Sequence, residues 1–415
     1  MKYPAMLLAC TLLAAAASAA EPLKIAVLAV QRGPYAALGE EALRGFNVAL
    51  SQFGGTAGGR EILPVITGTD ASPDDAVRAA ARLVEQEQVE ILIGPVSGSA
   101  GIALRDFAGK QPQVTIINGI SAAPETTFVD PAVNFFRFNM DAAQWSAGLG
   151  DYIFNEKGYR KIALVSEDYP FAYAQTFGLI IEFCRAGGKI TKRIWVPSGT
   201  SDFASVIAAL GEDIDAVYLG LAGGDALNFV RQYLQAGGNA HLIGGTIMVD
   251  TTLLTAVGPA REALLGVPFA GPQADSWDDP GWRKFIKEYR DEFEPEQRFS
   301  SPSIPATGYF TATTAALTCV DKVGGDLSDG HAAFRACLAA LELEAPNGMI
   351  SLDGNRQAIG TNFVSEITEF EDRTLATRTV RVVSGINQSF GISPGVFAAI
   401  GPPGRDTPVC KADYE

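Results

Sequence analysis

Leu23-Lys-Ile-Ala-Val-Leu-Ala-Val30 is followed by Gly33-Pro-Tyr-Ala-Ala-Leu-Gly39 and then by Glu40-Glu-Ala-Leu-Arg-Gly-Phe-Asn-Val-Ala-Leu50. The first run predicts a buried strand, the second a loop of small residues and the third a helix. This order is typical of an open α/β sheet, in which ligands bind beyond the carboxyl ends of the strands. The loop therefore makes Tyr35 a candidate ligand-binding residue.

Residues 1–20 resemble an export signal: Lys2 precedes an apolar run, Met6–Ala17, and the small residues Ser18–Ala20 follow it. The run is shorter than the ~20 apolar residues that span a bilayer. Leu7-Leu-Ala-Cys10 also resembles a lipoprotein signal, so lipidation at Cys10 is an alternative. We expect a periplasmic protein, exported through this signal peptide, with no stable membrane insertion.

The chain has 415 residues and a formal net charge of −15 at pH 7. Its length favours two domains. Lys and Arg form no cluster along the chain, and phosphate binding depends on such clusters, so we expect no nucleic-acid partner. We interpret the excess of acidic residues as a contribution to solubility and not as a sign of a particular partner.

Four cysteines follow the expected signal, and in an oxidising compartment they permit two disulfides with three possible pairings. Cys319 and Cys337 lie in consecutive predicted helices and form a plausible pair. Cys184 and Cys410 would then join the tail to the rest of the chain. None of the spacings resembles a zinc site, and we expect no cofactor.

Predicted strands alternate with predicted helices from residue 23 to about residue 270, a pattern that makes parallel sheets with right-handed crossovers. Two such series predict two similar lobes. We expect a helix beginning after Ser72 and a continuous helix over Ala142–Lys157. Strands over Lys161–Val165 and Ile190–Trp195 flank a loop, Ser166–Tyr173, and the helix that follows it.

After Gly266 the pattern changes to predicted helices over Pro280–Phe293, Ala306–Val323 and His331–Leu343. A β-hairpin is expected over Gly348–Ile367, with a further strand pair to about residue 387. Residues 391–415 show no periodicity and predict an irregular tail.

Catalytic patterns are poorly represented. The chain has only two histidines, His241 and His331, in different kinds of segment, and each is interpreted as a surface or capping residue. Neither Ser97 nor Ser99 has glycine at both flanking positions of a nucleophile elbow. Dinucleotide and P-loop patterns are absent. The sequence therefore favours a protein that is not an enzyme.

A binding function is better supported, because loops at strand ends present backbone N–H groups and the positive ends of helices. Small residues there would let a carboxylate approach, and aromatic residues would form a wall. The small residues are Ser97, Gly98, Ser99 and Ser121, and the aromatic residues are Tyr35, Trp145, Tyr169 and Phe171. Core packing is an equal alternative for Trp145.

Several stretches in order resemble the periplasmic type I solute-binding proteins of ABC importers, in the branched-chain amino acid (Leu/Ile/Val-binding) group. They are Ile25-Ala-Val-Leu…Gly33-Pro34…Gly39-Glu40…Gly45…Ala49, then Ile93-Gly-Pro-Val-Ser97, Phe136-Arg137…Asp141, Asp215-Ala-Val-Tyr…Phe229-Val-Arg-Gln232, and Pro346-Asn-Gly348…Asp353…Arg356-Gln357. The likeness extends to about residue 387.

This resemblance implies an α/β fold with two doubly wound Rossmann-like lobes joined by a three-stranded hinge, crossed near residues 140, 267 and 348. The N-terminal lobe would comprise residues 21–140 and 268–347. The C-terminal lobe would comprise residues 141–267 and 348–390, and residues 391–415 would form the tail. Ligand would lie between the lobes.

The resemblance also implies a ligand site. Its carboxylate-binding serine falls on Gly98, or on Ser97 if the loop shifts by one, and its carboxylate-binding threonine falls on Ala122, beside Ser121. Its aromatic walls fall on Phe171 and Ala222, and the acid for a ligand ammonium falls near Thr246. The candidate set is completed by neighbouring residues, which are Ile120, Tyr169 and Gly223.

The departures bear on the ligand, because a buried ammonium without a carboxylate partner is costly. Loss of that acid and of the threonine hydroxyl argues against an ordinary α-amino acid, and Ala222 leaves room for a bulkier group. We expect a small organic acid, aromatic acids included, a neutral amide or an amino-acid-like solute. The protein would be a monomer that delivers this ligand to ABC permease subunits. A ligand-sensing module that reports to a signalling partner is the alternative.

Overall fold

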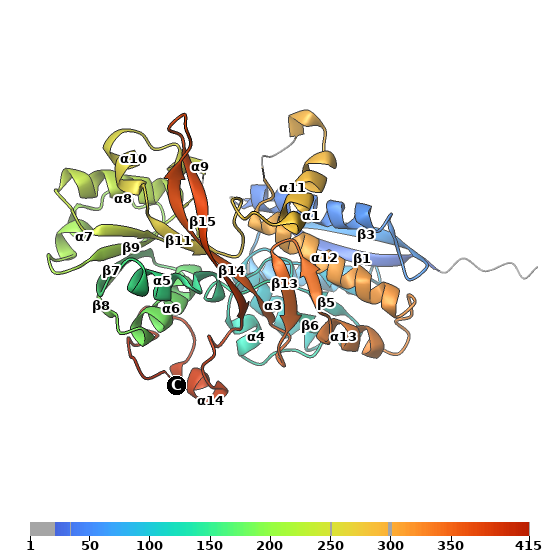
Figure 1. Ribbon diagram of the computed structural model, residues 1–415. Coiled ribbons are helices and arrows are strands. Elements are labelled where there is room, and N and C mark those ends of the chain that lie inside the picture. Colours follow the sequence, from blue (N-terminus) through green and yellow to red (C-terminus); the bar gives the residue numbers. More distant parts are fainter. Residues whose placement is uncertain (1–20, 34, 250, 298–300, 415) are drawn as a thin grey trace, which may run out of the picture.

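The computed structural model describes residues 21–33, 35–249, 251–297 and 301–414 (Figure 1). The expected signal peptide and Cys10 lie outside the described residues. Two lobes with parallel sheets stand side by side, and a third sheet lies between them. The expected α/β fold of two Rossmann-like lobes joined by a three-stranded hinge is confirmed.

The first sheet has the strand order β2-β3-β1-β4-β5-β6 and is parallel except for the β2–β3 pair. Its strands are β1 (Leu23–Val30), β2 (Thr56–Ala57), β3 (Arg60–Thr69), β4 (Ile91–Ile93), β5 (Thr115–Ile117) and β6 (Phe135–Phe136). On β1, Ile25 and Val27 belong to one buried core while Ala26 and Leu28 belong to another. Helices therefore cover both faces of this sheet.

Side-chain caps start several of the helices of the first lobe. The helices of this lobe are α1 (Ala36–Gln52), α2 (Pro73–Glu85), α3 (Gly98–Ala108), α4 (Glu125–Phe128), α11 (Pro280–Asp291), α12 (Ile304–Lys322) and α13 (Ala332–Ala339), with the 3₁₀ turn η2 (Pro295–Gln297). The predicted cap on α2 is confirmed, because the Ser72 hydroxyl accepts a hydrogen bond from the Asp75 N–H. Helix α1 starts earlier than Glu40, within the expected loop.

The second sheet is parallel, with the strand order β10-β9-β7-β8. Its strands are β7 (Lys161–Glu167), β8 (Lys189–Val196), β9 (Ala216–Gly220) and β10 (His241–Gly244). Helices α5 (Leu149–Asn155) and α6 (Pro170–Arg185) contribute to one core. The other core includes residues of α7 (Ala204–Ala209), α8 (Gly223–Gln235), α9 (Thr251–Leu254) and α10 (Gly258–Leu264).

The third sheet is antiparallel, with the order β11-β14-β13-β12 and with β15 also paired to β14. Its strands are β11 (Pro268–Gly271), β12 (Leu343–Ala345), β13 (Gly348–Leu352), β14 (Ala358–Glu369) and β15 (Leu375–Ile386). The expected hairpin and strand pair after residue 348 are thus present.

Two further predictions of local structure were wrong. The expected helix over Ala142–Lys157 is interrupted: a 3₁₀ turn, η1 (Gln144–Ser146), precedes α5, and Gly148 between them has a left-handed φ of +85°. The Glu182 carboxylate accepts hydrogen bonds from the Gly148 and Gly150 N–H groups, so a distant helix supplies the cap that starts α5. The expected irregular tail contains a helix, α14 (Pro394–Ile400).

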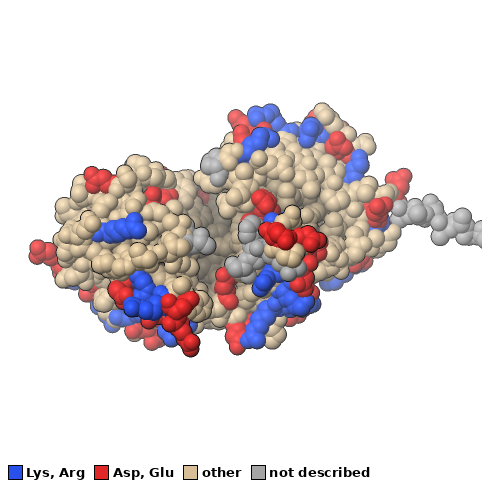
Figure 2. Space-filling model, turned by 90° about the horizontal axis from the view of Figure 1, so that it is seen from above, with Lys and Arg blue, Asp and Glu red and all other residues tan. Residues whose placement is uncertain are grey.

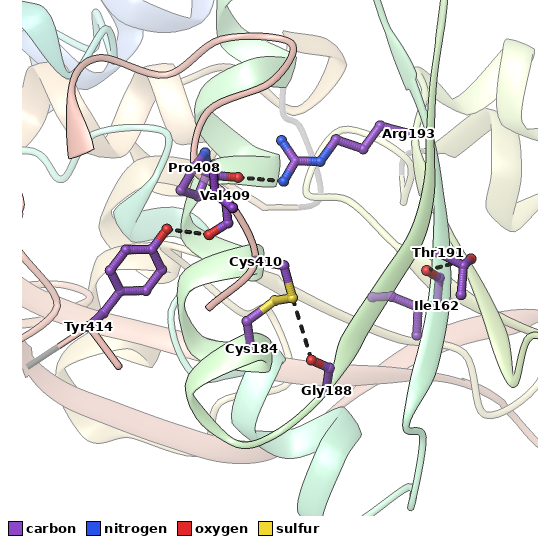
Figure 3. The surroundings of a disulfide bond; sticks show 9 residues. All are labelled: Ile162, Cys184, Gly188, Thr191, Arg193, Pro408, Val409, Cys410 and Tyr414. Atoms are coloured by element: carbon purple, nitrogen blue, oxygen red, sulfur yellow. Dashed lines mark hydrogen bonds between the residues drawn. A yellow bond between two sulfur atoms is a disulfide. The ribbon is translucent and has the colours of Figure 1, made fainter. Parts of the chain in front are cut away.

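Both expected disulfides are present, Cys319–Cys337 between α12 and α13 and Cys184–Cys410 between α6 and the tail. Figure 3 shows the second, hereafter the tail disulfide, with Arg193 beside it. The Arg193 guanidinium donates to the Pro408 carbonyl, and the Tyr414 hydroxyl donates to the Val409 carbonyl. The tail is therefore held against the C-terminal lobe.

Over the described ranges, the structure contains no helix with both the length and the apolar character needed to cross a membrane.

Candidate functional site

The candidate site lies where loops at the carboxyl ends of the strands of both lobes approach each other. Figure 2 shows a hollow between the two lobes. At the hinge, a small cavity of about 30 Å³ has walls from both lobes and from all three connecting segments. It is lined by Ile120, Phe138, Asn139, Met140, Trp145, Pro272, Gln273, Ile304, Thr307, Gly308, Thr311, Asn347, Ile350, Gly360 and Thr361. Of the sequence-predicted residues, only Ile120 and Trp145 are among them.

The loop after β4 places Ser97 at the start of α3. Its hydroxyl donates to the Ala71 carbonyl at 2.6 Å and accepts from the Ala100 N–H at 3.3 Å, so the side chain fixes the helix start. The first N–H groups of a helix, here those of Gly98 and Ser99, have no intrahelical acceptor. An anionic group of a ligand could accept hydrogen bonds from them at the positive end of the α3 dipole.

The loop after β5 places Ser121 and Ala122 at the base of the cleft. The Ser121 hydroxyl is fully buried and donates to Asn118 Oδ1 at 2.7 Å. A Cβ on Gly101 of α3 would lie 2.0 Å from this hydroxyl, so the side chain points into the α3 contact. The Ala122 carbonyl accepts from the Ala142 N–H at 2.9 Å and thereby joins the loop to the segment after the first crossing.

Aromatic residues gather at the start of α6. The structure begins this helix at Pro170, so Tyr169 is its N-cap residue and Phe171 lies in its first turn, whereas the sequence predicted a loop to Tyr173. Both rings are half-buried and stacked, with centroids 6.1 Å apart. The Trp145 ring meets Phe171 edge-on at 5.5 Å. Trp145 combines the two expected roles, since it packs in the core and also lines the cavity.

Tyr35 begins α1 in the opposite lobe and is half exposed. Burial raises the pKa of Tyr169, and the charges of Glu167 and then Tyr35 raise it further. A ligand between the lobes would meet aromatic rings from both sides.

The loop after β9 places Ala222 before α8, and Gly223 is the first residue of that helix. The Ala222 N–H donates to Glu167 Oε1 at 2.9 Å, and the Ser198 hydroxyl donates to Glu167 Oε2 at 2.7 Å. Glu167 is 4 % exposed, so this buried carboxylate ties three loops of the lobe together. Ala222 itself is exposed and leaves space at the cleft surface.

Thr246 follows β10 and lies against the second crossing. Its hydroxyl donates to the Ala270 carbonyl at 2.6 Å. Thr246 is thus hydrogen-bonded to the hinge strand β11, and it has no carboxylate to offer to a ligand in the cleft.

Sequence reasoning missed the polar residues at the base of the cavity. Gln273 accepts from the Thr307 hydroxyl at 3.0 Å, and the Asn347 amide donates to the Pro272 carbonyl at 3.1 Å. The buried Asn347 Oδ1 has no hydrogen-bond partner among the described residues. The motif Pro346-Asn-Gly348 was recognised as part of the family resemblance, but nothing in its spacing indicated a cavity.

Within the part of the chain that the structure describes, no group of three or more His, Cys, Asp or Glu side chains is arranged to hold a metal ion. His241 is exposed and stacks on Tyr159. His331 takes the N-cap position of α13, but it is buried beside Thr115 and not on the surface. The two histidines lie in different lobes and cannot act together.

Comparison with known proteins gives a family and a fold. A family model described as "periplasmic binding protein" matches residues 22–371. The "Leu/Ile/Val-binding protein homolog 6" of Brucella melitensis biotype 1 is 24 % identical over 373 residues, which cover 89 % of this chain and 93 % of that protein.

Solved structures share the fold. An ABC transporter substrate-binding protein from Sphaerobacter thermophilus superposes with a TM-score of 0.80 at 24 % identity, covering 88 % of this chain and 99 % of that one. A solute-binding protein of an ABC transporter from Rhodopseudomonas palustris BisB5, in complex with 3,4-dihydroxy benzoic acid, superposes with a TM-score of 0.75 at 23 % identity. The match covers 88 % of this chain and 98 % of that protein.

Proposed function

The chain belongs to the periplasmic binding protein family, and from this premise we propose that it is the solute-capturing component of an ABC importer. It would bind a small organic acid, aromatic acids included, or an amino-acid-like solute between its lobes and deliver it to membrane permease subunits. Such a protein is not an enzyme, because its ligand is released unchanged. Its place of action would be the periplasm.

The observation that carries this proposal is the two-lobed architecture, in which two parallel α/β lobes are joined by three hinge segments that meet around a small cavity. A ligand that contacts both lobes binds the closed form more tightly than the open form and shifts the population toward closure. Periplasmic binding proteins are named examples of such hinge closure. We propose that the lobes, residues 21–140 with 268–347 and residues 141–267 with 348–390, swing about crossings near residues 140, 267 and 348.

The ligand class is argued from the polar groups of the cleft. The start of α3 offers N–H donors to a carboxylate. Thr246 supplies no acid for an ammonium, and Glu167 already has two donors from the protein. Tyr35, Tyr169 and Phe171 offer an aromatic wall. The relatives point to the same two classes, since one is named for Leu/Ile/Val and another holds 3,4-dihydroxy benzoic acid.

Isothermal titration of the purified protein with benzoate, hydroxybenzoates, leucine, valine, phenylalanine and tyrosine tests the proposal. We expect saturable 1:1 binding of at least one carboxylate and a smaller radius of gyration in solution scattering of the complex. Phe171→Ala should weaken that binding, whereas Phe370→Ala, at an exposed phenylalanine far from the cleft, should not. Failure of every acid to bind, or chemical change of a bound acid, would refute the proposal.

The alternative is a ligand-sensing module that reports to a signalling partner. Both functions require the same capture step, so the partner discriminates between them. Ligand-dependent uptake into vesicles that contain the cognate permease would support transport. Ligand-dependent activation of a membrane sensor without uptake would support signalling.

A further inference from the structure

Behind the aromatic wall of the C-terminal lobe lies a buried pair of polar side chains without hydrogen-bond partners. Both amide atoms of Gln175 and the hydroxyl of Tyr218 are unpaired among the described residues. Gln175 is 1 % exposed and Tyr218 is fully buried. Leaving buried polar groups unpaired costs about 1–3 kcal/mol each, so such a pair calls for a partner that the chain itself does not supply.

The two side chains meet at one point, beside Gly245. A Cβ on Gly245 would lie 2.7 Å from the Tyr218 hydroxyl oxygen and 3.2 Å from Gln175 Oε1. A Cβ on Gly220 would lie 3.1 Å from Cε1 of the Tyr218 ring. Neither glycine has a positive φ, so their smallness is explained by space and not by backbone conformation. The tyrosine ring thus leans along β9 toward the carboxyl ends of the strands.

The pair adjoins the cleft from the side of α6. Gln175 follows Phe171 by four residues and therefore lies one helical turn below it on the same face of the helix. Gly245 directly precedes Thr246. Burial raises the pKa of Tyr218, and the charge of Tyr169 raises it further.

We propose that Gln175 and Tyr218 form a polar subsite that binds a neutral hydroxyl group at the end of the ligand opposite its carboxylate. An amide and a phenol each offer donors and acceptors, as a hydroxyl group does, so all three can satisfy one another. The subsite does not suit a ligand ammonium, which would need a carboxylate partner. The carboxylate of Glu167 already accepts hydrogen bonds from the Ser198 hydroxyl and the Ala222 N–H. This inference rests on the proposed function, since it needs a ligand in the cleft.

Matched ligand pairs test the subsite: benzoate against 3- and 4-hydroxybenzoate, and phenylalanine against tyrosine. Wild type should bind the better hydroxylated member about five- to tenfold more tightly than its parent, because one buried hydrogen bond is worth about 1–1.5 kcal/mol. Tyr218→Phe and Gln175→Met should abolish this preference while changing the affinity for the parent compound less than about threefold.

A thermal melt without ligand separates a subsite from a structural pair or an internal water site. Removing polar atoms that have no partner in the fold should leave the Tm of both variants unchanged or higher. Tyr309→Phe is the matched control: this buried hydroxyl donates to the Leu28 carbonyl, so its loss should lower the Tm and leave the hydroxyl preference intact.

The binding and melting experiments together distinguish the subsite from the alternatives. Loss of preference in both variants with an undiminished Tm supports the subsite. Equal affinity of wild type for both members of the pair that binds, a preference that survives in both variants, or a fall in Tm like that of Tyr309→Phe overturns the inference and leaves the proposed function standing. Failure of all the acids to bind refutes the proposed function and the subsite together.

Discussion

Glu182→Gln should make the stability of the protein less dependent on pH. Glu182 lies on α6, and its carboxylate accepts three hydrogen bonds of 2.8–3.2 Å from the N–H groups of Gly148 and Gly150. Burial nevertheless raises the pKa of Glu182 from 4.5 to about 7. The hydrogen bonds lower the pKa and the nearby charge of Asp151 raises it. Desolvation of the ionised form is the largest of these effects, so the pKa lies above its usual value.

The sign follows from linkage between protonation and folding. Because the folded-state pKa is raised, the contribution of Glu182 to stability is fully present below about pH 4.5 and is lost as the pH rises toward 7. Each pH unit of separation is worth about 1.4 kcal/mol, so the loss amounts to about 3 kcal/mol. A glutamine amide oxygen still accepts from Gly148 but cannot ionise.

Urea unfolding between pH 5 and pH 8 measures the effect. The free energy of unfolding of Glu182→Gln, relative to wild type, should rise by about 2–3 kcal/mol over this range. Glu85→Gln, at an exposed glutamate on α2, should show no such trend. A difference between Glu182→Gln and wild type that stays constant with pH would refute the reasoning that desolvation dominates at this site.

Three further predictions concern stability. Replacing Cys184 and Cys410 together by alanine should lower the free energy of unfolding by as much as about 5 kcal/mol, because the tail disulfide closes a loop of 226 residues; denaturant midpoints under oxidising conditions measure it. Asp141→Asn should lower the free energy of unfolding by about 3 kcal/mol, since it removes the carboxylate that lies 3.7 Å from the guanidinium of the fully buried Arg137. Equal stability of the variant and wild type at pH 7 would contradict this. Gly119→Ala should destabilise by more than about 1–3 kcal/mol, because its Cβ would lie 2.2 Å from a tyrosine ring carbon, whereas Gly224→Ala, with open space around it, should leave the Tm unchanged or raise it.

Much of the fold could be predicted because its signals are local. Alternating apolar runs and small-residue loops between residues 23 and 270 specify parallel strands, and Ser72 with Pro73 specifies a helix start. The start of α6 was predicted too late, although Pro170 is well suited to the first helical position. The break before α5 could not be predicted, because its cap comes from Glu182, more than thirty residues away in the chain.

The candidate site was predictable only in outline. Loops at strand ends indicate where a ligand would lie, and the sequence placed Ser97, Phe171 and Ala222 in such loops. It could not tell that the Ser121 hydroxyl points into a helix contact or that Thr246 braces a hinge strand. The sequence contained no indication of the polar residues inside buried elements. Periodicity alone does not distinguish a tyrosine in a strand or a glutamine in a helix from an ordinary core residue.

Strand β14 has a consequence for how the protein melts. Its first residue, Ala358, belongs to the core of one lobe, while Val364 and Ile367 farther along belong to two cores of the other. One uninterrupted stretch of backbone therefore contributes to the interior of both halves, and this shared strand couples their unfolding. In a scanning calorimeter the protein should absorb heat in a single peak, and the amide protons of β14 should be among the slowest to exchange with deuterated solvent.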